Sequence, residues 1–126
     1  TVVVGSDGSS LKPEGVLGER RVHPRNYGTF PRVLGRYVCE RGVLSLEEAI
    51  QKMTSITADR FGLDGRGRVQ EGAFADLVVF DAKEVTDRAT FTEPHLYPEG
   101  IPYVLVNGSV VIDRGEHIGA LPGLVL

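Results

Sequence analysis

The chain opens with Thr1-Val2-Val3-Val4-Gly5-Ser6-Asp7-Gly8, a short apolar run that ends in an acidic residue flanked by serine and glycine. Barrels of α/β enzymes present catalytic carboxylates in this way, at the end of a buried strand. We therefore predict a strand over residues 1–6 that carries Asp7 at its end. A parallel strand needs neighbours, and little in the remaining sequence supplies them. We expect the chain to be the tail of a larger enzyme.

Composition is that of an ordinary globular protein and argues against two classes of partner. The chain has 126 residues, a hydrophobic fraction of 41% and a net charge of -3. Such a charge gives no basic surface for nucleic acid, and no apolar run approaches the ~20 residues that span a membrane. The single cysteine, Cys39, excludes an internal disulfide and fits a reducing compartment, so we expect a cytoplasmic protein.

A long loop and then a helix follow the first strand. Residues 8–29 are charged and rich in Gly, Pro and Ser, and loops of this length are usually functional or disordered. From Phe30 apolar residues recur at helical spacing, and Pro31 suits a first helical turn.

Two further helices are predicted before residue 63. Ser45, followed three residues later by Glu48, predicts a capping box at a helix start. A short helix over residues 57–61 should end at Gly62, because glycine readily takes the left-handed conformation of a helix cap.

From Arg66 onward the pattern favours about four strands. Residues 75–80, 101–106 and 109–113 are candidates, and Asn107-Gly108 between the last two is a strong hairpin signal. A sheet this small must bury one face against another layer.

The cover of that sheet has two candidate sources. The helices of this chain could supply it, or missing strands could complete a β-sandwich. We favour missing strands, because Val78, Val79 and Phe80 form a run that is apolar on both faces.

Asp7 and the tripeptide His23-Pro24-Arg25 are the residues best suited to chemistry. A strand-end carboxylate can bind a divalent metal or shuttle a proton, although an aspartate that caps a turn fits Asp7 equally well. Pro24 restricts the backbone around His23, and the planar fork of Arg25 suits a carboxylate. A solvated loop is the simpler reading of this tripeptide alone.

A complete metal site is not predicted from the local sequence. His23, His95 and His117 are not paired at helical or strand spacing, and no Cys/His cluster has the spacing of a zinc site. Cys39 is interpreted as a small packed residue rather than a nucleophile.

Two motifs near the start of the first helix are the most specific pieces of an ordered set: His23-Pro24-Arg25 and the run from Tyr27-Gly28-Thr29-Phe30-Pro31-Arg32 to Tyr37. The other pieces are Val4-Gly5-Ser6-Asp7-Gly8, Ala49-x-x-Lys52-Met53-Thr54, Ala58-x-Arg60-Phe61-Gly62-Leu63, Arg66-Gly67-Arg68-Val69-x-x-Gly72-x-x-Ala75-Asp76-Leu77-Val78-Val79-Phe80-Asp81, Gly100-Ile101, Val104-x-Val106-Asn107-Gly108 and Pro122-Gly123-x-Val125-Leu126. Taken in order, these motifs resemble the late barrel region and tail of N-acyl-D-amino-acid deacylases, the D-aminoacylases of the amidohydrolase superfamily.

The resemblance implies a fold of two parts. Residues 1–65 would be the end of a (β/α)8 barrel, with strand eight, a substrate loop and closing helices. Residues 66–126 would be the C-terminal portion of a small β-sandwich. The chain would thus be α/β followed by β.

The resemblance also implies a zinc-dependent hydrolase that cleaves the amide bond of N-acyl-D-amino acids. Asp7 matches the family aspartate that contacts the metal and relays a proton, and Arg25 matches the arginine that binds the α-carboxylate of the small-molecule substrate. The metal-binding histidines and bridging cysteine of the family lie on earlier strands. We therefore expect the chain alone to be inactive and to need the remainder of the enzyme as its partner.

Two alternatives stay open. The chain could be a non-catalytic structural or assembly module. It could also belong to a cyclic amidase of the same superfamily, similar to a dihydroorotase or hydantoinase. A substrate with a free carboxylate, which Arg25 would bind, favours the linear amide.

Overall fold

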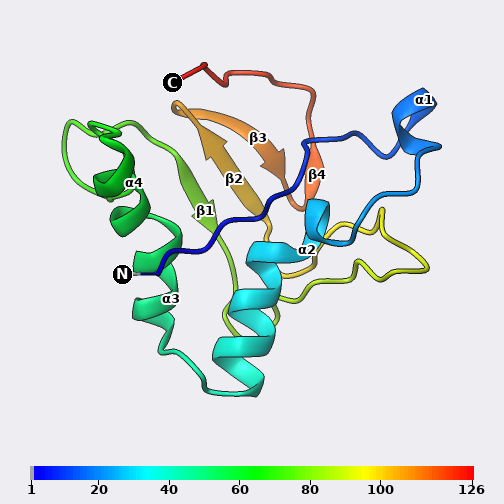
Figure 1. Cartoon of the computed structure of the whole chain (residues 1–126). Helices are drawn as coiled ribbons and strands as arrows, with labels where there is room; N and C mark the ends of the chain where they lie inside the picture. Colours follow the sequence, from blue (N-terminus) through cyan, green and yellow to red (C-terminus); the bar gives the residue numbers. More distant parts are fainter. Residues whose placement is uncertain (1) are drawn as a thin grey trace.

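The computed structural model describes residues 2–126, with helices first and strands after them (Figure 1). The four strands form one antiparallel sheet in the order β1-β2-β3-β4. The elements are α1 (Gly15–Gly18), α2 (Arg25–Arg32), the π-helix η1 (Val33–Glu40), α3 (Leu46–Met53), α4 (Ser55–Phe61), β1 (Leu77–Val79), β2 (Tyr103–Val106), β3 (Ser109–Asp113) and β4 (Glu116–His117).

The strand predicted over residues 1–6 is not formed. Thr1 lies outside the described residues, and residues 2–6 have no strand assignment. Val4 N–H instead donates to the Lys52 carbonyl at 3.3 Å, and Lys52 Nζ donates to the Val2 carbonyl at 3.0 Å. The reason is physical: a parallel strand exists only beside another strand, and the described sheet is built from residues 77–117.

The first long helix begins earlier than predicted. α2 starts at Arg25 rather than near Phe30, so Pro31 lies inside it and not in its first turn. Pro31 has no N–H to donate, and the chain winds as the π-helix η1 from Val33. The predicted loop is correspondingly shorter and contains the single turn of α1.

The local signals at the later helices are confirmed. Ser45 Oγ accepts the Glu48 N–H at 3.1 Å, while the Glu48 side chain accepts the Ser45 N–H at 2.9 Å, which is the predicted capping box. α4 ends at Gly62, whose φ of 67° is left-handed.

The predicted hairpin is also confirmed. Asn107 and Gly108, with φ of 47° and 80°, connect β2 to β3. Positive φ at both central residues is the pattern of a type I′ turn.

The buried core lies between the helices and the segment that follows β1, not beneath the sheet. Val33 and Leu34 of η1, Ala49 of α3 and Val85 form one cluster. On β1, Val78 and Val79 remain 55% and 50% exposed. The sheet therefore keeps much of its apolar surface uncovered by the described residues.

Gly35 permits the closest approach in this core. A Cβ atom at Gly35 would lie 2.4 Å from the Val85 carbonyl oxygen, a separation that real Cβ atoms do not show. The backbone of η1 can thus rest directly on the segment around Val85.

Arg66 links the turn before the sheet to the β2–β3 hairpin. Its guanidinium pairs with the Asp76 carboxylate, donates to Asn107 Oδ1 at 2.9 Å and lies 4.2 Å from the centroid of the Phe74 ring. Asp76 Oδ1 accepts the Asn107 N–H at 2.8 Å, and Asn107 Nδ2 donates to the Pro122 carbonyl at 2.7 Å. We call Arg66, Asp76 and Asn107 the hairpin clasp.

Among the described residues, no helix has both the length and the apolar character needed to cross a membrane.

Gly35→Ala should destabilise the chain despite the better helix propensity of alanine. Overpacking a tight contact costs about 1–3 kcal/mol, and the propensity gain of about 1 kcal/mol offsets part of this. Urea unfolding should show a lower midpoint for this variant. Gly123→Ala is the control, because a Cβ there meets nothing within 4 Å; equal midpoints for the two variants would refute the close-approach argument.

Arg66→Ala should lower the free energy of unfolding by roughly 2 kcal/mol. This is below the ~3–5 kcal/mol for one partner of a fully buried pair, because Asp76 keeps part of its exposure. Arg88→Ala removes the exposed Arg88–Glu99 pair and should cost less than about 1 kcal/mol. Thermal unfolding of both variants checks this, and a larger loss for Arg88→Ala would contradict the role of the hairpin clasp.

Candidate active site around Asp7 and Arg25

Asp7 lies where the extended N-terminal segment turns toward the loop. Its φ of 49° is left-handed, and Ser6 Oγ accepts the Gly8 N–H at 3.2 Å across it. Aspartate tolerates this conformation better than most residues. The Asp7 side chain is 88% exposed, so its carboxylate is available for further contacts.

His23-Pro24-Arg25 forms the entry to α2. Pro24 is buried, and His23 Nδ1 accepts the Arg25 N–H at 3.0 Å. Thr29 Oγ1 donates to the Arg25 carbonyl at 3.0 Å one turn along the helix. Arg25 is therefore the first residue of a regular helix rather than a residue of a solvated loop.

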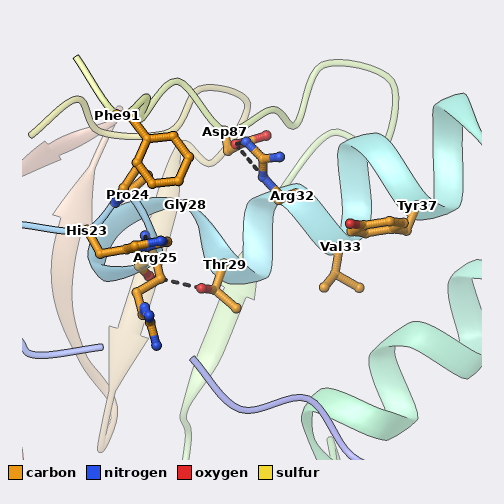
Figure 2. Close-up of a pocket in the computed structure, with 10 residues that line it drawn as sticks. All are labelled: His23, Pro24, Arg25, Gly28, Thr29, Arg32, Val33, Tyr37, Asp87 and Phe91. Atoms are coloured by element: carbon orange, nitrogen blue, oxygen red, sulfur yellow. Dashed lines mark hydrogen bonds and ion pairs between the residues drawn. The ribbon is translucent and has the colours of Figure 1, made fainter. Parts of the chain in front are cut away.

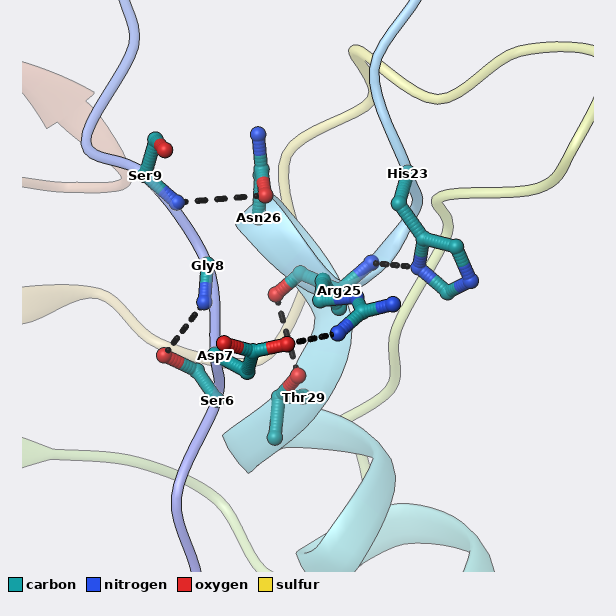
Figure 3. A network of polar contacts seen from close by, with 8 residues as sticks. All are labelled: Ser6, Asp7, Gly8, Ser9, His23, Arg25, Asn26 and Thr29. Atoms are coloured by element: carbon teal, nitrogen blue, oxygen red, sulfur yellow. Dashed lines mark hydrogen bonds and ion pairs between the residues drawn. The ribbon is translucent and has the colours of Figure 1, made fainter.

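The structure brings the two candidates together. Arg25 Nη1 donates to Asp7 Oδ2 in an ion pair, with the Arg25 side chain 38% exposed (Figure 3). The residues are separated by a long loop, and sequence analysis assigned them separate roles. A guanidinium has five N–H donors, so Arg25 can hold Asp7 and still offer donors to a second carboxylate.

Three side chains fasten the loop between Asp7 and Arg25. Asn26 Oδ1 accepts the Ser9 N–H at 3.3 Å, the Tyr27 hydroxyl donates to the Leu11 carbonyl at 2.8 Å, and His95 Nε2 lies 3.0 Å from the Arg20 carbonyl.

Tyr27 is a part-buried anchor. Burial, with a smaller contribution from nearby Tyr97, raises the pKa of the Tyr27 phenol. Its hydroxyl therefore remains a donor at neutral pH.

A cavity of about 300 Å³ lies between α2 and the segment that contains Asp87 and Phe91 (Figure 2). Arg32 closes part of it by pairing with Asp87, with 2.7 Å between Nη2 and Oδ2. The residues that line it are His23, Pro24, Arg25, Gly28, Thr29, Arg32, Val33, Tyr37, Asp87 and Phe91. Arg32, Asp87 and Phe91 had no predicted role: Arg32 lies within the Tyr27–Tyr37 motif of the resemblance, and no local motif marks Asp87 or Phe91, because the cavity forms only when two distant segments meet.

A smaller cavity of about 190 Å³ is bordered by Arg25 together with Ser6, Gly8 and Asn26. Arg25 thus borders two cavities and the Asp7 carboxylate.

The described residues do not assemble a metal site by themselves. Within residues 2–126 no group of three or more His, Cys, Asp or Glu side chains could hold a metal ion. Asp7 is the one predicted ligand, and it supplies a single carboxylate. Cys39 is exposed, contrary to the packed position expected, and its Sγ donates to the Ala82 carbonyl at 2.8 Å.

Comparison with known proteins gives matches along nearly the whole chain. Residues 16–112 match the model of an amidohydrolase family. The chain is 48% identical to a D-aminoacylase and 51% identical to an N-acyl-D-glutamate deacylase, both from Alcaligenes xylosoxydans xylosoxydans, over 98% of its length. It spans 24% of either relative. A dihydroorotase from Endomicrobium trichonymphae is 37% identical over 58% of the chain.

Solved structures of deacylases give the same result. A D-aminoacylase crystal structure superposes with a TM-score of 0.84 at 47% identity, covering 94% of this chain and 23% of that one. An N-acyl-D-glutamate deacylase from Bordetella bronchiseptica, complexed with zinc and a phosphonate inhibitor, gives 0.77 at 50% identity, covering 86% and 22%.

These matches confirm the resemblance on which the sequence analysis relied. With three quarters of its residues in the matched segment, the chain belongs to the amidohydrolase family.

Proposed function

We propose that this chain forms part of a zinc-dependent hydrolase that cleaves the amide bond of N-acyl-D-amino acids, releasing a carboxylate and a free D-amino acid. The observation that carries the proposal is the Asp7–Arg25 pair, a candidate proton relay beside a candidate carboxylate-binding group. The relatives with 48% and 51% identity are deacylases of such substrates by name.

In this proposal the rest of the protein supplies most of the site. Asp7 would give one oxygen ligand to zinc, and the other ligands would come from residues outside this chain. A zinc ion in such a site polarises the acyl carbonyl and acidifies water. Alone, the chain would be inactive.

Asp7 would act on protons at two atoms. Its carboxylate takes a proton from the attacking water as the new C–O bond forms at the acyl carbon. It then delivers this proton to the amide nitrogen as the C–N bond breaks, so that the amine leaves neutral.

Arg25 would bind the substrate α-carboxylate with the N–H donors that Asp7 does not use. Because Arg25 also touches Asp7, one guanidinium would set the distance between the substrate carboxylate and the proton relay. Such positioning of reacting groups lowers the barrier to reaction.

We assign residues 1–65 to the end of the barrel and residues 66–126 to part of a β-sandwich. We also propose that the protein is cytoplasmic. The half-exposed Val78 and Val79 support a missing second sheet, since apolar sheet faces are normally covered.

A cyclic amidase is the second candidate, supported by the more partial match to dihydroorotase.

Asp7→Asn should greatly reduce kcat in the complete enzyme and change KM little. The variant keeps the size of the side chain but cannot accept the proton, and such groups contribute about 10²–10⁴-fold in rate. Steady-state kinetics with N-acetyl-D-methionine checks this. Near-normal kcat with zinc bound would refute the relay.

Arg25→Ala should lower kcat/KM for the free acid far more than for its methyl ester. The wild-type guanidinium makes charge-assisted hydrogen bonds only with the carboxylate of the free acid. The substitution therefore removes these bonds from the acid substrate and not from the ester. The ratio of kcat/KM for N-acetyl-D-methionine to that for its methyl ester measures this loss. An equal loss on both substrates would contradict the carboxylate role.

The chain alone should not bind zinc tightly, because protein zinc sites use three or four ligands and Asp7 supplies one. Calorimetric titration of the chain with zinc at neutral pH should give the same weak trace for wild type and Asp7→Asn. Stoichiometric, sub-micromolar binding would show that this chain assembles its own site.

A further inference from the structure

The proposed chemistry gives no role to His23, whose side chain contacts the backbone at the start of α2. We propose that His23 is a positioning residue for Arg25: its imidazole holds the turn from which the guanidinium projects. The kinetic consequence of this role, though not the contact itself, rests on the proposed function of Arg25.

The backbone around Arg25 forms a tight turn. The His23 carbonyl accepts the Asn26 N–H at 3.1 Å, three residues on. Pro24 between them has φ of -52° and ψ of -23°, which fit the second position of a type I turn, where proline is favoured. Arg25 follows as the first residue of α2, and its direction depends on this turn remaining closed.

The imidazole closes this turn a second time. His23 Nδ1 lies 3.0 Å from the Arg25 amide nitrogen. A backbone N–H can only donate, so Nδ1 carries no proton and the neutral ring holds its proton on Nε2. The contact spans residues i and i+2, as in the turns that Asn and Asp side chains make with the backbone.

The bond also satisfies a helix terminus. The Arg25 N–H is the first amide of α2, and the first amides of a helix have no partner within it. Without the imidazole this donor would turn to solvent, and the turn would keep only its backbone bond.

A distant segment steadies the ring. Phe91 meets His23 edge to face, with centroids 5.0 Å apart and planes at 88° (Figure 2). This is a favourable aromatic geometry. Both rings line the 300 Å³ cavity that Arg25 also borders, and the solvent-exposed imidazole contacts both the start of α2 and the segment after β1.

The chain offers a matched control at its other end. His117 Nδ1 accepts the Gly119 N–H at 3.0 Å, which is the same i to i+2 contact at β4. His117→Ala therefore removes an equivalent bond away from Arg25.

The tautomer and the amide can be measured by NMR on the complete enzyme, with ¹⁵N-labelled histidine and arginine. Long-range ¹H–¹⁵N correlation should show His23 protonated on Nε2 only. Hydrogen exchange of the Arg25 amide should accelerate roughly fivefold in His23→Ala, as for the loss of one hydrogen bond, and stay unchanged in His117→Ala. A proton on Nδ1 in the neutral ring, or an unaltered Arg25 amide, would overturn the proposal.

In the complete enzyme, His23→Ala should lower kcat/KM for N-acetyl-D-methionine roughly fivefold, with kcat/KM for the methyl ester little affected. His23→Asn should restore the kinetics on the acid substrate, because the asparagine Oδ1 can accept a hydrogen bond from the same Arg25 amide. Equal losses on acid and ester, or no rescue by asparagine, would show a merely structural role and overturn the positioning assignment.

The experiments separate a failure of the role proposed for Arg25 from a failure of the proposed His23 contact. If Arg25→Ala does not discriminate acid from ester, the carboxylate role proposed for Arg25 fails, and with it the kinetic consequence for His23. The contact between imidazole and amide is then still decided by the NMR measurement.

Discussion

The contact between the Gly35 backbone and the Val85 carbonyl is the constraint on which this structure depends. No side chain fits between them, so η1 rests on the segment after β1 at backbone distance. Because α2 runs directly into η1, this contact also fixes how far α2 lies from Asp87 and Phe91. The cavity beside Arg25 and the ring contact of His23 both follow from that distance.

Features set by neighbouring residues could be predicted from the sequence. The capping box of Ser45 and Glu48, the end of α4 at Gly62 and the Asn107-Gly108 hairpin each depend on a few adjacent residues, and all three are confirmed. The start of α2 was predicted wrongly because Pro31 resembles a first-turn proline. The structure instead begins the helix directly after Pro24, where a proline is equally acceptable.

Features set by distant partners could not be predicted in the same way. The strand expected at residues 1–6 needs neighbours, and the described residues give it none. Asp7 and Arg25 are recognisable in the sequence as separate candidates, but their ion pair requires the intervening loop to fold back. The contributions of Asp87 and Phe91 to the cavity depend on the Gly35 contact, which has no local signature.

The ion pair and the three loop anchors have a consequence for variation in this family. The loop from Gly8 to Pro24 begins and ends at residues that are held together independently of its interior. For a flexible loop closed in this way, doubling the length costs only about 0.6 kcal/mol in chain entropy. Insertions and deletions around α1 should therefore leave Asp7 and Arg25 in place, and this loop is where members of the family can diverge in length and in surface.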